Sequence, residues 1–94
     1  MRYELAFHPD AIGEWHRLDK TVAEQLKEKL AERLVNPVVP SARVSGDVDL
    51  YKIKLRTVGF RLVYQVQGKH LTVLVLSVGK RERNAAYKAA LGRL

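Results

Sequence analysis

The segment YKIKLRTVGFRLVYQV, residues 51–66, constrains the fold of this chain more than any other. Apolar side chains alternate with cationic or polar ones along both halves of the segment, and Val58 and Gly59 separate the halves. Alternation with a period of two is typical of a strand that is buried on one face, and a short glycine-containing link is typical of a hairpin turn. The segment therefore predicts a β-hairpin with one apolar and one charged face.

A two-residue turn would fix the register of this hairpin and put Leu55 opposite Leu62 on the apolar face. A strand face in water needs polarity, but it does not need several charges of one sign. On the charged face the same register predicts three pairs: Arg56 with Arg61, Lys54 with Val63, and Lys52 with Gln65. The four cations of this face are therefore candidates for binding an anion.

The segments on either side of the hairpin predict an α+β fold. The expected elements are a half-buried strand in residues 2–7, a short helix from Pro9 to near Asp19, a second helix over residues 21–34 with Thr21 and Glu24 as a possible capping box, a loop over residues 38–49, and a short helix in residues 83–94. The two early helices are expected to form a hairpin of their own.

Residues 71–78 are apolar on both faces, which favours a strand at the centre of a sheet. A two-residue turn at Gly68 and Lys69 would pair Val66 with Leu71 and complete a three-stranded antiparallel meander. The N-terminal strand is the natural neighbour on the other side. Together they predict a four-stranded sheet.

Length and composition limit what this chain can be. The 94 residues suffice for one modest core, so we expect a single domain over residues 1–94. No apolar run reaches the ~18 residues of a membrane span, and the first ten residues lack the apolar stretch of a signal peptide. We therefore expect a cytoplasmic protein. The absence of cysteine excludes disulfides, thiolate catalysis and Cys-ligated zinc.

The net charge of +7 is distributed unevenly along the chain. Residues 1–49 carry 7 basic and 9 acidic side chains, whereas residues 50–94 carry 10 basic and 1 acidic. This segregation suggests a polyanionic partner, with nucleic acid the first choice and an anionic membrane the second. A basic charge that only keeps the protein soluble would explain the sign but not the segregation.

The residues after the central strand extend the positive charge of the hairpin. Lys80 and Arg81 are expected to leave the sheet at the end where Arg61 stands, and Arg83 adds another cation. Tyr87 follows four residues later on the expected helix. Cations along a groove, with an aromatic side chain that can stack on a base, are the recurrent plan of single-strand binding.

These motifs resemble those of a known family. YKIKLRTVGFRLVYQV, followed by VLVLSVGKRERNAAY, strongly resembles the RelE family of toxins, which are ribosome-dependent mRNA interferases of bacterial toxin–antitoxin modules. The resemblance covers nearly the whole chain, including EWHRL and VAEQLKEKL. It implies cleavage of mRNA in the decoding site of the 70S ribosome, without a metal ion or another cofactor. It also implies inhibition by a cognate RelB-type antitoxin, through which the complex would bind its own operator DNA.

The resemblance also implies roles for individual residues. Lys52 and Lys54 match the family's active-site lysines, Arg61 the arginine that holds the scissile phosphate, Arg81 an arginine proposed as general acid or charge stabiliser, and Tyr87 the aromatic residue that orients the base. Elementary chemistry agrees in part. A lysine acts as a base only when its pKa is lowered, which neighbouring cations favour. Arginine hardly deprotonates, so charge stabilisation suits Arg81 better than proton transfer.

Other charged residues are given lesser roles. Arg56, Lys80 and Arg83 are expected to bind RNA through their charge alone. Glu14 is expected on a helix surface and Ile12 in the core, and the histidines are assigned no function.

The last helix is rich in small residues, with few apolar anchors beyond Leu91 and Leu94. We therefore expect it to dock only marginally. An antitoxin segment could then displace it and remove Tyr87 from the site.

Two alternative functions remain open. A ParE-like toxin of the same fold acts on DNA gyrase and lacks the catalytic cations, whose joint presence here argues against it. A nucleic-acid-binding module without catalysis would explain the charge segregation equally well. Loss of cleavage with retained RNA affinity in Arg81→Ala would separate an enzyme from a binding module.

Overall fold

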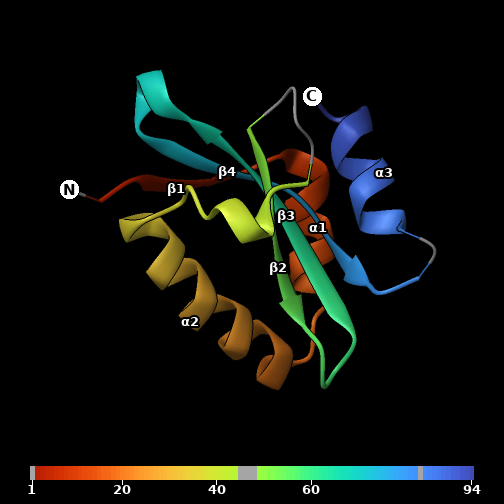
Figure 1. The fold of residues 1–94 in the computed structure, drawn as a ribbon. Helices are drawn as coiled ribbons and strands as arrows, with labels where there is room; N and C mark the ends of the chain where they lie inside the picture. Colours follow the sequence, from red (N-terminus) through yellow and green to blue (C-terminus); the bar gives the residue numbers. More distant parts are fainter. Residues whose placement is uncertain (1, 45–48, 83) are drawn as a thin grey trace.

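A computed structural model describes residues 2–44, 49–82 and 84–94. It contains a four-stranded sheet with the strand order β1-β4-β3-β2, in which β1 is parallel to β4 and the other neighbours are antiparallel. The elements are β1 (Glu4–Phe7), α1 (Pro9–His16), α2 (Lys20–Val35), the 3₁₀ turn η1 (Pro40–Ala42), β2 (Leu50–Leu55), β3 (Phe60–Gln67), the 3₁₀ turn η2 (Gly68–His70), β4 (Thr72–Lys80) and α3 (Ala85–Gly92) (Figure 1). The predicted α+β fold is confirmed, including β1 as the second neighbour of the central strand. None of the helices in the described ranges has the length and apolar character to cross a membrane.

The starts of the first two helices differ in how they are capped. Helix α1 begins at Pro9, and the Nδ1 atom of His8 accepts a hydrogen bond of 3.1 Å from the Asp10 N–H. Helix α2 begins at Lys20 and lacks a side-chain hydrogen bond at its cap, Asp19. The predicted capping box of Thr21 and Glu24 is therefore wrong. Thr21 already lies inside the first turn, where it is not in the cap position.

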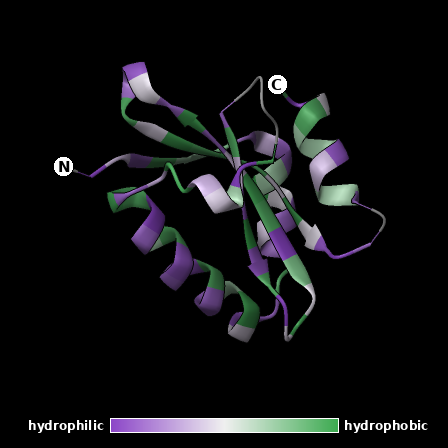
Figure 2. Ribbon diagram, viewed as in Figure 1, coloured by the Kyte–Doolittle hydropathy of each residue, from purple (hydrophilic) through white to green (hydrophobic). Residues whose placement is uncertain are grey.

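The larger core lies between the sheet and helices α1 and α2. Four residues of α2 at spacings of four, Val22, Leu26, Leu30 and Leu34, are buried as predicted. They pack against the apolar side chains of β2, β3 and β4. Figure 2 shows hydrophilic residues on the outward face of α2. Ile12, which was expected in the core, is 42% exposed.

A second, smaller core lies under α3 on the other face of the sheet. Ala86 and Ala90 pack there against Leu50, Val63 and Leu76. Because alanine has a short side chain, α3 can approach the strands closely. The predicted anchors of this helix were wrong, since Leu91 is 50% exposed and Leu94 is 54% exposed.

The hairpin of β2 and β3 has a longer turn than the sequence suggested. Leu55 pairs with Phe60, so that residues 56–59 form the turn, which the Gly59 N–H closes with a hydrogen bond of 2.8 Å to the Leu55 carbonyl. The predicted pairs are corrected accordingly: Lys54 lies opposite Arg61, Lys52 opposite Val63, and Ile53 opposite Leu62. The shift is an even number of residues, so each side chain stays on the predicted face.

The connection between β3 and β4 is also longer than predicted. It comprises η2 and Leu71, which adopts a left-handed conformation with φ of 47°, and Val66 pairs with Val73 rather than with Leu71. A β-bulge then interrupts the ladder, because Tyr64 pairs with Val75 but Val63 pairs with Ser77. The extra residue in β4 was not visible in its uniformly apolar sequence.

Candidate functional site

Three of the predicted site residues meet at the end of the β2–β3 hairpin. Lys54 and Arg61 are cross-strand neighbours, and Arg81 follows the last residue of β4. A cavity of about 140 Å³ is lined by these three side chains together with Arg56 and by Leu55 and Phe60. Lys52 lies two residues before Lys54 on the same strand and is half-buried. The predicted face of cations is thus present.

Arg81 is held at this end of the sheet by its backbone. Its N–H donates a hydrogen bond of 2.7 Å to the carbonyl of Gly59 in the hairpin turn. Gly59 has φ of +70°, a conformation that favours glycine. The turn therefore fixes the start of the Arg81 side chain close to Arg61.

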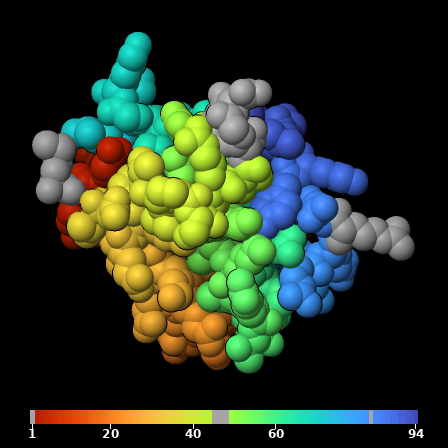
Figure 3. Space-filling view, in the orientation of Figure 1, coloured from red at the N-terminus to blue at the C-terminus, as the bar shows by residue number. Residues whose placement is uncertain are grey.

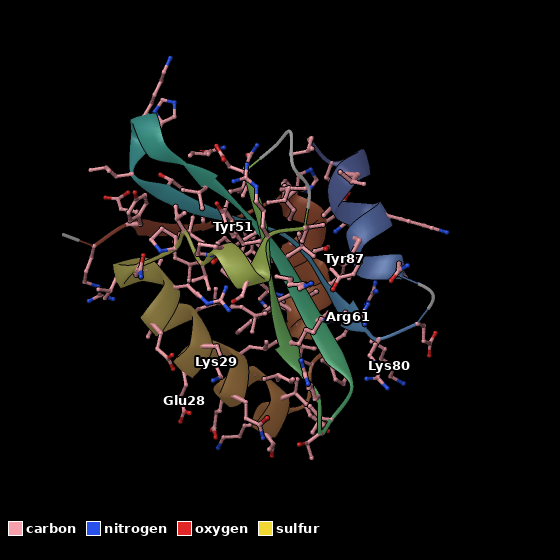
Figure 4. All side chains as sticks on the ribbon, viewed as in Figure 1. Glu28, Lys29, Tyr51, Arg61, Lys80 and Tyr87 are labelled. Atoms are coloured by element: carbon pink, nitrogen blue, oxygen red, sulfur yellow. The ribbon has the colours of Figure 1, made fainter. Side chains whose placement is uncertain are left out.

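Helix α3 supplies the aromatic side of the site. The guanidinium carbon of Arg61 lies 5.0 Å from the centre of the Tyr87 ring, a cation–π contact (Figure 4). Arg61 Nη1 also donates a hydrogen bond of 3.3 Å to Asn84 Oδ1. Asn84 precedes α3 and has φ of 59°, a left-handed conformation that asparagine tolerates. The Tyr87 hydroxyl and Arg61 Nε are buried and have no hydrogen-bond partner among the described residues.

The clustered cations change the protonation of one lysine. The charge of Lys52, together with desolvation and the charges of Arg61, Arg56 and Arg81, lowers the pKa of Lys54 below its ordinary value. Each neighbouring positive charge disfavours protonation. The surroundings of Lys54 therefore make its protonated form less favourable than that of an isolated lysine.

An ion pair outside the cationic face fixes the far end of α3. Arg93 Nη1 and Nη2 donate hydrogen bonds of 2.9 Å to Glu14 Oε1 and Oε2. Burial by itself would raise the pKa of Glu14, but the hydrogen bonds from Arg93 and from the Val78 N–H outweigh it and lower the pKa. Glu14 is therefore not the simple surface residue that the sequence suggested.

Lys80, one of the predicted RNA-binding cations, does not line this cavity. Lys80 pairs with Phe60, and its side chain lines a different depression together with Glu14 and Arg17. The strand alternation separates it from Arg61, whose partner in β4 is Gly79. Arg83 lies outside the described residues.

Three polar residues that contact distant parts of the chain escaped the sequence-based prediction. Arg33 of α2 donates from Nη1 to the carbonyl of Lys52 at 3.1 Å and to the hydroxyl of Tyr64 at 2.9 Å. Arg33 directly precedes a buried leucine, but helix periodicity gives no partner for it. Asn84 and Glu14 likewise carry no local signal, because their contacts are made with distant parts of the chain.

The described residues offer no group of three or more His, Asp or Glu side chains that could hold a metal ion. The polar side chains that line or contact the candidate site belong to Lys, Arg, Tyr and Asn. Such a set can bind phosphate, stabilise negative charge and exchange a proton through a lysine of lowered pKa.

Comparisons with known proteins identify the family of this chain. Residues 5–85 match the family model for the ParE toxin of the type II toxin–antitoxin system parDE. The mRNA interferase toxin RelE of Escherichia coli strain K12 is 49% identical over 94 residues, which are 100% of this chain and 99% of that protein. A second E. coli protein, named as RelE-like, is equally similar over the same shares.

Solved structures give the same result. A free mutant of the E. coli toxin RelE superposes with a TM-score of 0.92 at 47% identity, covering 100% of this chain and 99% of that one. The toxin chain of the intact E. coli RelBE toxin–antitoxin complex has a TM-score of 0.82 and 51% identity, covering 86% and 99%. The chain therefore belongs to the RelE-like toxins of type II toxin–antitoxin systems.

Proposed function

We propose that this toxin is a ribosome-dependent endoribonuclease that cleaves mRNA in the ribosomal A site and so inhibits translation. The observation that carries the proposal is the cavity shared by Lys54, Arg61 and Arg81, with Tyr87 stacked against Arg61. A cavity lined by cations fits the phosphate of the scissile bond, and an aromatic ring beside it fits a base. The interferase name of the E. coli relative supports the same activity.

The proposed reaction is an attack of the ribose 2′-hydroxyl on the adjacent phosphorus. Lys54, or Lys52, removes the hydroxyl proton, the P–O5′ bond breaks, and the products are a 2′,3′-cyclic phosphate and a 5′-hydroxyl. The lowered pKa of Lys54 supports its role as the base. Arg61 binds the phosphate, and Arg81 stabilises the charge that develops in the transition state, with proton donation to the leaving oxygen as its second role. The reaction draws on no metal ion or cofactor in this scheme.

The ribosome supplies what this set of side chains lacks. Lysine and arginine are weak acid–base catalysts near neutral pH, so the rate depends on an RNA strand that is already bent for in-line attack. In this proposal the A site holds the mRNA codon in that bent conformation. The toxin acts there as one domain, residues 1–94, in the cytoplasm. This dependence explains how a modest catalytic set could be both active and selective.

The cognate partner is proposed to be a RelB-type antitoxin. Complexes of RelE toxins with RelB antitoxins have been solved for E. coli and for Pyrococcus horikoshii. An acidic or amphipathic antitoxin segment would cover the cationic face or displace α3. Because Tyr87 belongs to α3, displacing the helix would also remove Tyr87 from the site. The toxin–antitoxin complex would bind operator DNA through the antitoxin.

Primer extension on a defined mRNA tests the proposal, with the purified toxin in the presence and absence of programmed ribosomes. We expect cleavage at the A-site codon only with ribosomes. Arg61→Ala and Arg81→Ala should lose cleavage, whereas Lys69→Ala, which removes an exposed cation within η2, should retain it.

The family model that matches this chain is named for ParE, so the same protein is also assayed for inhibition of DNA gyrase. Gyrase inhibition without mRNA cleavage would overturn the proposal, as would full activity in both arginine variants.

A further inference from the structure

A second basic groove adjoins the cavity of the candidate site. It has a volume of about 420 Å³ and is lined by residues of α2, η1, β2 and the hairpin turn: Arg33, Ser41, Ala42, Lys52, Lys54 and Arg56. Lys54 and Arg56 line both hollows, so the two lie next to each other. Figure 3 shows the face on which the orange α2, the yellow-green η1 and the green β2 meet. The basic surface therefore extends beyond the place of the proposed scissile phosphate.

Arg33 is held at the edge of the sheet by the protein itself. β2 is an edge strand, and the Lys52 carbonyl accepts a hydrogen bond from Arg33 Nη1. The same Nη1 donates to the hydroxyl of Tyr64, which in turn donates to the Pro37 carbonyl at 2.7 Å. The guanidinium carbon also lies 5.8 Å from the centre of the Tyr64 ring. These contacts orient the guanidinium before any ligand binds.

The contacts leave most of the Arg33 guanidinium available. Both hydrogen bonds within the described part of the chain start at Nη1, so the N–H groups of Nε and Nη2 can bind another acceptor. A planar fork of N–H donors matches two oxygens of a phosphate. Ser41 on the exposed wall of the groove offers a hydroxyl as a further donor.

The charges of the groove call for an anion. Four of the lining residues are cations, and none of the described lining residues is acidic. Repulsion from Lys52 and Arg56 is visible in the lowered pKa of Lys54, for which the charge of Lys52 is the largest cause. From Lys52 to Leu55, the last residue of β2, the strand covers ~10 Å at ~3.3 Å per residue, and Arg56 follows in the turn. That length spans more than one phosphate of a single RNA strand.

We propose that this groove is a second phosphate-binding site, in which Arg33 holds a backbone phosphate of RNA away from the scissile bond. The inference rests on the proposed function for the identity of the polyanion. The phosphate belongs either to the cleaved strand, continued past the cavity, or to ribosomal RNA beside it. In both cases Arg33 contributes to affinity and not to the chemical step.

Fluorescence anisotropy with non-cleavable 2′-O-methyl RNA tests the site, using labelled oligomers of three and seven nucleotides over a series of salt concentrations. Arg33→Gln removes the charge, and Lys27→Gln is the matched control, since Lys27 is on the same helix but lines an apolar groove on its other side. Because Arg33→Gln also loses two internal hydrogen bonds, Ser41→Asp places a negative charge in the groove with Arg33 intact. Thermal melting checks that each variant is folded.

We expect Arg33→Gln and Ser41→Asp to bind the seven-nucleotide oligomer about fivefold more weakly and the three-nucleotide oligomer as the wild type does. The slope of log affinity against log salt should become shallower by about 0.7 in Arg33→Gln, the value for one phosphate of a single strand. Wild-type affinity of both variants for both oligomers, with weaker binding to vacant 70S ribosomes, would assign the phosphate to ribosomal RNA.

Equal weakening for both oligomers would place Arg33 at the scissile phosphate and overturn the inference. Wild-type affinity of both variants for the oligomers and for the ribosome would overturn it too. This holds even if the variants bind the antitoxin more weakly. A wild-type protein that binds the oligomers but does not cleave mRNA on ribosomes would refute the proposed function and leave the second site testable.

Discussion

Glu14 in α1 and Arg93 after α3 form a bidentate ion pair just beyond the point where β1 stops pairing with β4. β1 pairs with β4 only as far as Val75. Beyond that point the Val78 N–H donates to Glu14 Oε1 at 3.0 Å, and the Leu76 carbonyl accepts from Arg93 Nη1 at 2.7 Å. The two side chains therefore provide hydrogen-bond partners for backbone groups of β4 that β1 does not reach, and their ion pair connects α3 to α1.

This relationship predicts that Glu14→Gln loosens α3. The amide side chain keeps the size of Glu14 but loses the charge, and a hydrogen bond to a charged group contributes about 2 kcal/mol. We expect the free energy of unfolding to fall by about that amount and the amides of α3 to exchange hydrogen faster than those of the central strand. Glu28→Gln, on the exposed surface of α2, is the control (Figure 4). Exchange in α3 that is unchanged by Glu14→Gln would show that small-residue packing alone holds the helix.

The same pair predicts a loss of stability in acid. The folded-state pKa of Glu14 lies below its ordinary value, so its ionised form favours the folded protein. This contribution is fully present above the unfolded-state pKa of ~4.3 and is lost as the pH falls through the folded-state pKa. Urea unfolding at a series of pH values between 7 and 3 measures this loss. The free energies of unfolding of the wild type and Glu14→Gln should converge below about pH 4. If the difference in free energy of unfolding between the two proteins stayed constant down to pH 3, the contribution would not come from the ionised form of Glu14.

Lys54 should titrate differently when its neighbour is removed. Lys52 is the largest cause of its lowered pKa, so Lys52→Met should raise the pKa of Lys54 toward the ordinary value. NMR titration of the lysine side-chain carbons measures this directly. Lys69→Met, beyond the far end of β3, should leave the Lys54 titration unchanged. If Lys54 is the base, the pH at which cleavage reaches half its maximum should rise with its pKa in Lys52→Met.

Tyr87 is predicted to act through its ring and not through its hydroxyl. The hydroxyl is buried and lacks a partner among the described residues, whereas the ring lies against Arg61. Tyr87→Phe should therefore cleave mRNA at close to the wild-type rate, while Tyr87→Leu should lose about tenfold, the scale of one base–aromatic stack. Single-turnover cleavage on programmed ribosomes gives both rates. A large loss in Tyr87→Phe would assign a proton-transfer or hydrogen-bonding role to the hydroxyl.

Gly59 should resist substitution because of its backbone conformation alone. A Cβ atom added there would meet no other atom within 4 Å, but φ is +70°. Gly59→Ala should lower the free energy of unfolding by about 1–2 kcal/mol, and Gly68→Ala, which also has open space and lacks a positive φ, should not. Chemical denaturation of the two variants provides the comparison.

The sequence predicted the fold well where patterns are local and regular. The four-residue spacing of Val22, Leu26, Leu30 and Leu34 marked the buried side of α2, and strand alternation put Lys54 and Arg61 on one face. Turn lengths were the weakest point. A register that is wrong by two residues leaves the faces unchanged, so the alternation could not reveal the error.

The sequence was less informative about the contacts of α3. Its packing through Ala86 and Ala90, rather than through Leu91, depends on how closely a helix of small residues can approach the sheet. Arg93 and Glu14 are 79 positions apart, so no local pattern joins them. Arg33 of α2 likewise donates a hydrogen bond to the carbonyl of Lys52 in β2, which no local pattern predicts. The roles of the predicted site residues remain predictions.

The bulge in β4 has a consequence for changes in chain length. Because Val75 pairs with Tyr64 and Ser77 with Val63, Leu76 is the residue without a partner of its own in β3. Deleting Leu76 would restore a regular ladder and leave Val78 on the side of the larger core, whereas deleting a residue within β3 would turn every later side chain of that strand over. A single-residue deletion should therefore keep each remaining side chain of the sheet on its own face at this bulge, but not within β3.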